Sequence, residues 1–233
     1  MPAPGLPVQA PAQSLVPAPV RGTVYGALLN HHDALAALGD AVHQPPYKAP
    51  PRAPVLYIKP RNTWVGNGDA VRVPAGVDAL EIGATLGLVL GRVACRVSPA
   101  QALSLVAGYV IVVDVSVPHA SFYRPSLRFK ACDSFCPIGA FVPADRAVDP
   151  DALDISVAID GQTVHRCSTA GLVRSCAQLL ADVSEFMTLS PGDVLSVGVA
   201  AGAPLARAGQ RVRVAISGLG QIENPLIAEG AAA

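Results

Sequence analysis

The apolar run at residues 108–116 constrains this chain more than any other segment, because it places a carboxylate, Asp114, near the end of a β-branched stretch. Such a run is typical of a buried strand. A charge buried there is costly unless it is paired or binds a metal ion. Asp114 is therefore either an oxygen ligand for Mg²⁺ or Mn²⁺, or a carboxylate hydrogen-bonded to loop backbone. Its position alone favours neither alternative.

The composition limits the classes of partner. The chain has 233 residues, which suits one large domain or a domain with a small appendage. Its 17 basic and 17 acidic residues give a formal charge of zero, without the electrostatic footprint of a nucleic-acid or membrane binder. The longest apolar stretch, residues 102–113, is shorter than the roughly 20 residues of a transmembrane helix. We expect no nucleic-acid partner and no membrane partner.

The cysteines indicate a reducing environment. Their odd number and the lack of paired C-x-x-C spacing argue against a disulfide framework and a structural zinc site. We therefore expect a cytoplasmic protein whose thiols are free, at Cys95, Cys132, Cys136, Cys167 and Cys176.

Changes in composition divide the chain into three parts. Residues 1–20 are rich in Pro and Ala and are predicted to form a disordered tail. Residues 21–54 are predicted to form a small N-terminal subdomain and connector, with a strand at 24–29 and a helix at 33–42. Residues 55–230 are predicted to form the main, catalytic-type domain.

The main domain has the pattern of many short strands and few helices. Helical spacing begins at Ser98 and again at Thr169, and Asp160-Gly161 predicts a hairpin turn. Strands are expected at residues 55–58, 70–73, 85–90, 108–116, 153–159, 163–166, 194–199 and 211–216. The pattern predicts an α+β fold, mostly β and rolled or barrel-like, with a small N-terminal α/β subdomain.

Several basic side chains are candidates for anion binding. Lys59 and Lys130 lie beside strand ends, where a lysine can bind a substrate carboxylate or stabilise an enolate, although a lone lysine is more often a surface residue. Arg61 and Arg124 can also meet carboxylates. His31 follows the first strand and is a candidate general base, or else a surface or capping residue.

The order of short motifs after Arg21 resembles that of one known family. Each motif is weak alone, but together they resemble the fumarylacetoacetate hydrolase family over nearly the whole chain. The resemblance implies a rolled, mostly β fold with a small amino-terminal domain. The motifs are Lys59-Pro60, Gly66-Asn67-Gly68-Asp69, Gly108-Tyr109, Val113-Asp114-Val115-Ser116, Lys130, Phe135-Cys136-Pro137-Ile138-Gly139, Pro191-Gly192-Asp193-Val194, Gly218-Leu219-Gly220 and Glu223-Asn224-Pro225.

Further segments narrow the resemblance to one branch of the family. They look like the amino-terminal half, or separate amino-terminal subunit, of the bifunctional isomerase/decarboxylases of 4-hydroxyphenylacetate breakdown. This implies decarboxylation of 5-oxopent-3-ene-1,2,5-tricarboxylate and isomerisation of 2-hydroxyhepta-2,4-diene-1,7-dioate. The segments are Leu29-Asn30-His31, Pro45-Pro46-Tyr47-Lys48-Ala49-Pro50-Pro51, Tyr57-Ile58-Lys59-Pro60-Arg61-Asn62-Thr63 and Ser121-Phe122-Tyr123-Arg124-Pro125.

The resemblance also implies a divalent cation, and here the chain departs from the family. The family holds Mg²⁺ or Mn²⁺ with a Glu-x-Glu pair and an aspartate that Asp114 matches. Gly83 and Thr85 stand where the two glutamates belong. Glu81 lies two residues early, on the same strand face and about 7 Å farther along. The resemblance therefore implies an incomplete metal site that does not hold a cation tightly in this chain alone.

Two further family features are absent. Ala34 and Ala37 stand where the family has a catalytic His and Glu. A Gly-Thr-Pro turn of the family is replaced by Gly198-Val199-Ala200, which removes a hydroxyl that faces substrate.

Three functions remain open at this stage. The first, which we favour, is a subunit of the decarboxylase/isomerase in which a homologous partner carries the metal, as a homo- or heterodimer. The second is a self-sufficient metal-dependent hydrolase or decarboxylase of small keto acids that uses Glu81 and Asp114. The third is a catalytically silent scaffold. Under the first, Lys130 and Lys59 bind the anionic substrate and Asp114 forms a salt bridge with Lys130.

Overall fold

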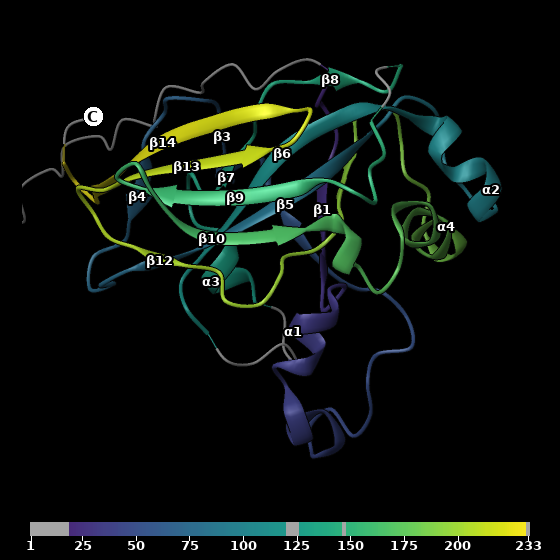
Figure 1. The fold of residues 1–233 in the computed structure, drawn as a ribbon, viewed down its shortest axis with the longest axis horizontal. Helices are drawn as coiled ribbons and strands as arrows, with labels where there is room; N and C mark the ends of the chain where they lie inside the picture. The colour runs from purple at the N-terminus through teal and green to yellow at the C-terminus, as the bar shows by residue number, and fades with distance from the viewer. Residues whose placement is uncertain (1–18, 120–125, 146–147, 232–233) are drawn as a thin grey trace, which may run out of the picture.

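The computed structural model describes residues 19–119, 126–145 and 148–231, and two packed β-sheets dominate it (Figure 1). The predicted tail at residues 1–20 therefore lies almost wholly outside the described residues. The larger sheet has the order β2-β1-β11-β5-β6-β8, with β12 beside β5. Its strands are β1 Val24–Leu28, β2 Val55–Lys59, β5 Leu80–Leu90, β6 Val106–Ser116, β8 Val142–Pro143, β11 Val194–Ser196 and β12 Leu205–Ala206.

The second sheet has five strands in the order β10-β9-β13-β14-β4, and a two-stranded pair, β3 with β7, lies apart from both. These strands are β3 Trp64–Val65, β4 Val71–Val73, β7 Cys136–Pro137, β9 Asp154–Ile159, β10 Gln162–Ser168, β13 Arg211–Ile216 and β14 Gly220–Ala228. The helices are α1 His32–Ala36, η1 Gly39–His43, η2 Arg61–Thr63, α2 Pro99–Ala102, η3 Leu103–Leu105, α3 Leu127–Lys130, η4 Thr169–Gly171 and α4 Cys176–Phe186.

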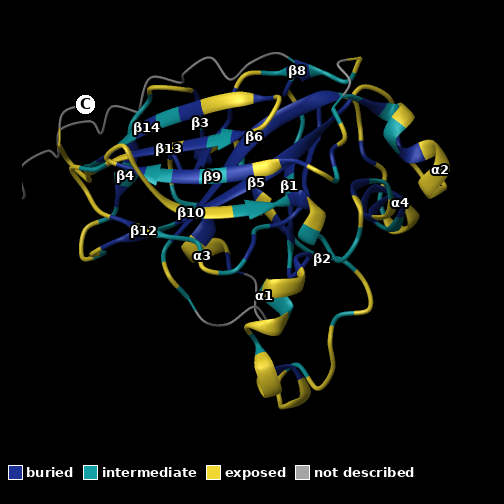
Figure 2. Cartoon of the chain, viewed as in Figure 1, coloured by how far each residue is buried: buried dark blue, intermediate teal, exposed yellow. Residues whose placement is uncertain are grey.

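The long antiparallel pair β5–β6 forms the centre of the molecule, and Figure 2 shows both strands buried. Side chains alternate between the two faces of a strand. One face of β5 carries Leu80, Ile82 and Leu86 into the core between the two large sheets. The opposite face carries Glu81, Gly83, Thr85 and Val89. On the same pair of strands, the sheet-to-sheet core and the polar residues are therefore on opposite faces.

The predicted strands at residues 24–29, 55–58, 153–159 and 211–216 are confirmed within a residue or two. β5 begins five residues earlier than predicted. β14 was missed, because its mixed composition lacks a clear apolar alternation. The fold is mixed and predominantly β, but the described strands close no barrel, so the barrel-like expectation is wrong.

The predicted helices are longer than the real ones. The helix expected at 33–42 is interrupted where Gly39 adopts a positive φ, which leaves α1 and η1 as two short turns. The helical stretch expected to begin at Ser98 forms only the short α2 and η3, since β6 already begins at Val106. The stretch after Thr169 is a short 3-10 turn, and α4 starts later with Ser175 as its side-chain cap.

The segment expected as a separate N-terminal subdomain is joined to the main sheet. β1 pairs in parallel with β11 and antiparallel with β2. Only α1 and η1 project away from the sheets, at the lower edge of Figure 1. All five cysteines are free, as predicted. No described helix has both the length and the apolar character needed to cross a bilayer.

A buried lysine ties the end of the larger sheet together. Lys59, the last residue of β2, is only 1% exposed. Its ammonium group donates hydrogen bonds to the carbonyl oxygens of Val115 at 2.6 Å, Lys130 at 2.8 Å and Phe135 at 3.0 Å. It therefore links β2, β6, α3 and the segment before β7. The three acceptors use all of its N–H groups.

Replacing this lysine should destabilise the fold. We expect Lys59→Met to lower the free energy of unfolding by about 3–5 kcal/mol, because removing one member of a buried ion cluster leaves polar groups without a partner. Urea unfolding monitored by tryptophan fluorescence measures the change. The matched control is Lys48→Met at an exposed lysine, with an expected change below about 0.5 kcal/mol. Equal unfolding midpoints for the two variants would contradict the structural role of Lys59.

A second prediction concerns α4, whose inner face fills one end of the core. Leu180 is fully buried, whereas Glu185 on the same helix is exposed. Leu180→Ala should cost about 2–5 kcal/mol, since it removes buried methyl groups and leaves a cavity. Glu185→Ala should change the unfolding free energy by less than about 0.5 kcal/mol. Similar losses in both variants would show that α4 does not pack as described.

Candidate functional site

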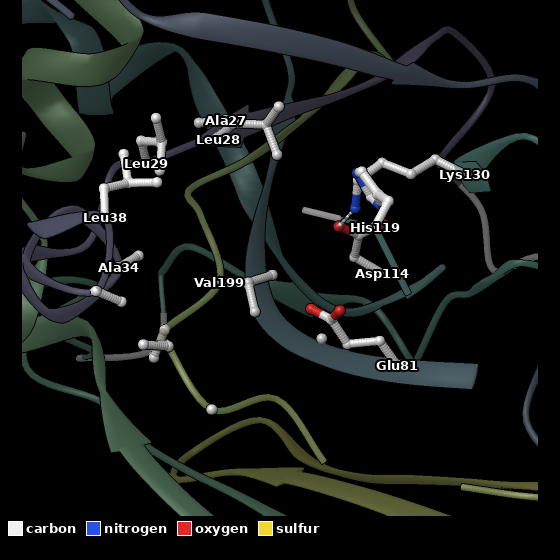
Figure 3. Close-up of a pocket in the computed structure, with 15 residues that line it drawn as sticks. Ala27, Leu28, Leu29, Ala34, Leu38, Glu81, Asp114, His119, Lys130 and Val199 are labelled. Atoms are coloured by element: carbon white, nitrogen blue, oxygen red, sulfur yellow. Dashed lines mark hydrogen bonds and ion pairs between the residues drawn. The ribbon is translucent and has the colours of Figure 1, made fainter. Parts of the chain in front are cut away.

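A cavity of about 330 Å³ lies beside the polar face of β5 and β6 (Figure 3). Its two ends differ in character. Side chains of Glu81, Asp114, His119 and Lys130 form a polar end. The opposite end and the wall between are apolar, lined by Leu28, Leu29, Ala34, Ala37, Leu38 and Val199. A cavity of this size with a few convergent polar groups is the usual form of a small-molecule site.

Asp114 is held between two lysines. It is 3% exposed, and Lys130 donates a hydrogen bond to Oδ2 at 2.6 Å while the Lys59 nitrogen lies 2.8 Å from Oδ1. Burial by itself would raise the pKa of the Asp114 carboxyl, but the charges of Lys130 and Lys59 hold that pKa well below its ordinary value. The expected salt bridge between Asp114 and Lys130 is therefore present, and the carboxylate stays ionised.

Tyr57 completes this cluster and was missed by the sequence analysis. It is buried, and the Lys130 nitrogen lies 4.6 Å from the centre of its ring. Burial, and then the Asp114 charge, raise the pKa of Tyr57. The ring occupies the space above Gly26, its direct partner across the β1–β2 pair, where any Cβ would overlap it. The sequence signal that could have identified Tyr57 is its pairing with Gly26, since a glycine opposite an aromatic residue leaves space for the ring.

The residues at the family's metal-ligand positions do not fit a divalent cation. Gly83 lies directly opposite Asp114, and a Cβ on Gly83 would approach Val199 Cγ2 to 2.9 Å. The Thr85 hydroxyl accepts hydrogen bonds from the Gly198 N–H at 3.2 Å and the Ser196 hydroxyl at 3.3 Å. Neither position supplies a carboxylate, and both Asp114 oxygens already face ammonium groups. Within the described ranges, no three His, Cys, Asp or Glu residues are grouped to hold a metal.

Glu81 enters the cavity from the same strand face. It pairs with Ser116, two positions along the ladder from the pair of Gly83 and Asp114, with no shift of register between them. Burial raises the pKa of the Glu81 carboxyl, while the charge of Lys130 acts in the opposite direction. Glu81 therefore reaches the polar end of the cavity without replacing either missing glutamate.

Lys130 and Asp114 line the cavity, but the other predicted site residues do not all lie there. Lys59 lies behind Asp114 and does not line the cavity, and its N–H groups are directed at three backbone carbonyl oxygens. Arg61 is exposed, outside the cavity, with its guanidinium 5.6 Å from the centre of the Trp64 ring.

His31 is also displaced from the cavity. It is buried, its Nε2 lies 3.1 Å from the carbonyl oxygen of Ser168, and its Nδ1 faces the carboxylate of Asp33. His31 is therefore not among the residues that line the cavity. Arg124 lies outside the described residues. Ala34 and Ala37, which replace the family's catalytic pair, do line the cavity wall.

Comparisons with known proteins identify the family of this chain. Residues 23–227 match the fumarylacetoacetate (FAA) hydrolase C-terminal family. The chain is 42% identical over 210 residues to the 4-hydroxyphenylacetate degradation bifunctional isomerase/decarboxylase of Salmonella dublin. The match covers 90% of this chain and 48% of that protein, within its amino-terminal half. The chain thus spans about half the length of the curated relatives it matches.

Solved structures show the same fold. Fumarylpyruvate hydrolase from Pseudomonas aeruginosa, in complex with Mn²⁺ and pyruvate, superposes with a TM-score of 0.80 at 25% identity, covering 96% of this chain and 99% of that one. The 5-carboxymethyl-2-hydroxymuconate delta-isomerase from Mycobacterium smegmatis gives 0.78 at 27% identity, covering 94% and 83%. From its matched residues and its relatives alike, the chain belongs to the fumarylacetoacetate hydrolase family.

Proposed function

We propose that this chain is one component of a decarboxylase/isomerase of keto di- and tricarboxylates, and that it works with a homologous partner that carries the divalent cation. The substrates are those of the related enzymes, 5-oxopent-3-ene-1,2,5-tricarboxylate and 2-hydroxyhepta-2,4-diene-1,7-dioate. The similarity to the amino-terminal half of the Salmonella dublin enzyme supports this choice. The match covers only 48% of that relative, whose remaining half can contain a second homologous unit.

One observation carries the proposal. Gly83 and Thr85 stand where the resemblance places the family's two glutamate ligands, so Asp114 has no second carboxylate beside it at either position. Mg²⁺ and Mn²⁺ need several oxygen ligands, and one carboxylate that also pairs with Lys59 and Lys130 does not supply them. The chain has a cavity beside Asp114 but lacks the two glutamates that would hold a cation there. This combination fits a chain whose metal chemistry resides in a partner.

The retained residues have roles that suit an anionic substrate. Lys130 lines the cavity and can direct an N–H toward a substrate carboxylate, while Asp114 and the Ser116 hydroxyl, 3.3 Å from its nitrogen, hold it in place. Lys59 fixes Asp114 from behind and is a positioning residue. Contacts from Arg124 to substrate stay a prediction.

The first test measures whether the chain needs a partner. Purified chain with Mg²⁺ should turn over the tricarboxylate at least about 100-fold more slowly than the chain mixed with a homologue from the same genome that keeps Glu-x-Glu, since Lewis-acid stabilisation contributes several kcal/mol. Release of CO₂ is the readout. Equal rates with and without the homologue would overturn the proposal in favour of a self-sufficient enzyme.

A variant of the cavity separates a working component from a scaffold. In the mixed complex, Lys130→Met should lower conversion of the tricarboxylate to the final keto product, Lys130→Arg should retain part of it, and Lys48→Met should have no effect. Size-exclusion chromatography checks that each complex still assembles. An assembled Lys130→Met complex with unchanged conversion would identify a scaffold.

Metal binding gives a readout that is independent of turnover. Free Mn²⁺ has a strong electron paramagnetic resonance signal that decreases when the ion binds protein. We expect the chain alone to leave this signal unchanged, because Gly83 and Thr85 supply no carboxylate beside Asp114. The homologue with Glu-x-Glu serves as the positive control. Loss of the free-ion signal at a one-to-one ratio of Mn²⁺ to the lone chain would contradict the proposal.

A further inference from the structure

The cavity contains one ionisable group whose role is unexplained. Among the described residues that line it, Asp114 and Lys130 are paired with each other. His119 is stacked on Phe129 at 5.0 Å, and its Nδ1 lies 3.0 Å from the Val117 carbonyl oxygen. Glu81 alone of these side chains makes neither a hydrogen bond nor an ion pair. Figure 3 shows its carboxylate directed into the cavity.

This arrangement is costly unless it is used. A half-buried carboxylate loses part of its hydration, and without a hydrogen bond or ion pair only the more distant charge of Lys130 offsets that loss. Glu81 is held there by its register in β5, where it pairs with Ser116, and its backbone lies in the most buried ladder of the fold. It is a partly exposed side chain on a strand and lines the cavity, which is the setting of a group that exchanges protons with a ligand.

We propose that Glu81 is a catalytic residue of this chain, the general acid–base that moves the proton in the isomerisation of a dienol carboxylate bound at Lys130. This inference rests on the proposed function and assigns its two reactions to different chains. Decarboxylation belongs to the partner's cation, whereas isomerisation takes place in the cavity of this chain and needs no metal.

The isomerisation is balanced in protons. In 2-hydroxyhepta-2,4-diene-1,7-dioate the O–H bond at C2 breaks and its proton passes to a base. The C2 oxygen becomes a ketone, the double bonds shift, and a new C–H bond forms at C5. One proton leaves and one enters, so no oxidant or co-reactant is required. Glu81 accepts the first proton or delivers the second, and the Lys130 ammonium stabilises the enolate between the two transfers.

The surroundings of Glu81 favour such a role. The neighbouring Lys130 offers a positive charge for the substrate carboxylate, which brings the dienol to the same end of the cavity. Glu81 lies two residues from Gly83 on the strand, about 7 Å along it, so it faces the ligand's chain rather than its head group. The apolar wall formed by Leu29, Leu38 and Val199 excludes water from the far side.

The experiment follows ketonisation of the dienol by the chain alone, without added metal and with a chelator present. Ultraviolet absorbance gives the rate, and nuclear magnetic resonance in D₂O gives the rate of deuterium incorporation at C5. We expect Glu81→Gln to lower kcat by at least about 100-fold with little change in KM. Glu81→Asp should retain part of the activity. The matched control is Glu185→Gln, at an exposed glutamate on α4.

The outcomes separate this inference from the proposed function. Unchanged kcat and unchanged deuterium incorporation in Glu81→Gln would overturn the role of Glu81. A lone chain that ketonises no faster than buffer would also overturn it, even if the mixed complex releases CO₂. Conversely, partner-independent ketonisation lost in Glu81→Gln would stand even if CO₂ release by the mixed complex failed. Melting temperatures confirm that each variant is folded.

Discussion

The pairing of one buried aspartate with two buried lysines is the interaction on which the rest of this structure depends. An isolated carboxylate inside β6 would be untenable in so apolar a strand. Lys59 and Lys130 reach it from β2 and α3, and Lys59 also donates to carbonyls 56, 71 and 76 residues away in sequence. The end of the sheet and the floor of the cavity are thus defined by the same cluster of charges.

Much of this could be predicted from the sequence, and the limits have physical causes. Periodicity located the strands that alternate clearly, and the position of Asp114 in its apolar run predicted a carboxylate that is either paired or bound to a metal. Spacing could not reveal that Lys59 lies behind Asp114 rather than in front of it, because that depends on how distant loops close. Helix lengths failed for a local reason, since Gly39 and the early start of β6 end the helical turns.

The residues of the site divide in the same way. Gly83, Thr85, Ala34 and Ala37 could be placed by comparison with a family pattern, and the cavity wall contains three of them. Tyr57 belongs to a segment that carries the resemblance, but its place beside Asp114 depends on a glycine across the ladder, which no motif indicates. Lone basic residues were the weakest predictions: His31 is bound by neighbouring backbone and side chains, and Arg61 covers a tryptophan at the surface.

The alternation of β5 has an evolutionary consequence. Its even-numbered side chains are fixed by the packing of two sheets, where a change of one methylene is felt. Two of its odd-numbered residues, Glu81 and Gly83, line the cavity on the opposite face, away from the packing between the two sheets. The scaffold and the chemistry of this strand can therefore diverge independently, and a lineage can lose one catalytic device and acquire another while the fold persists.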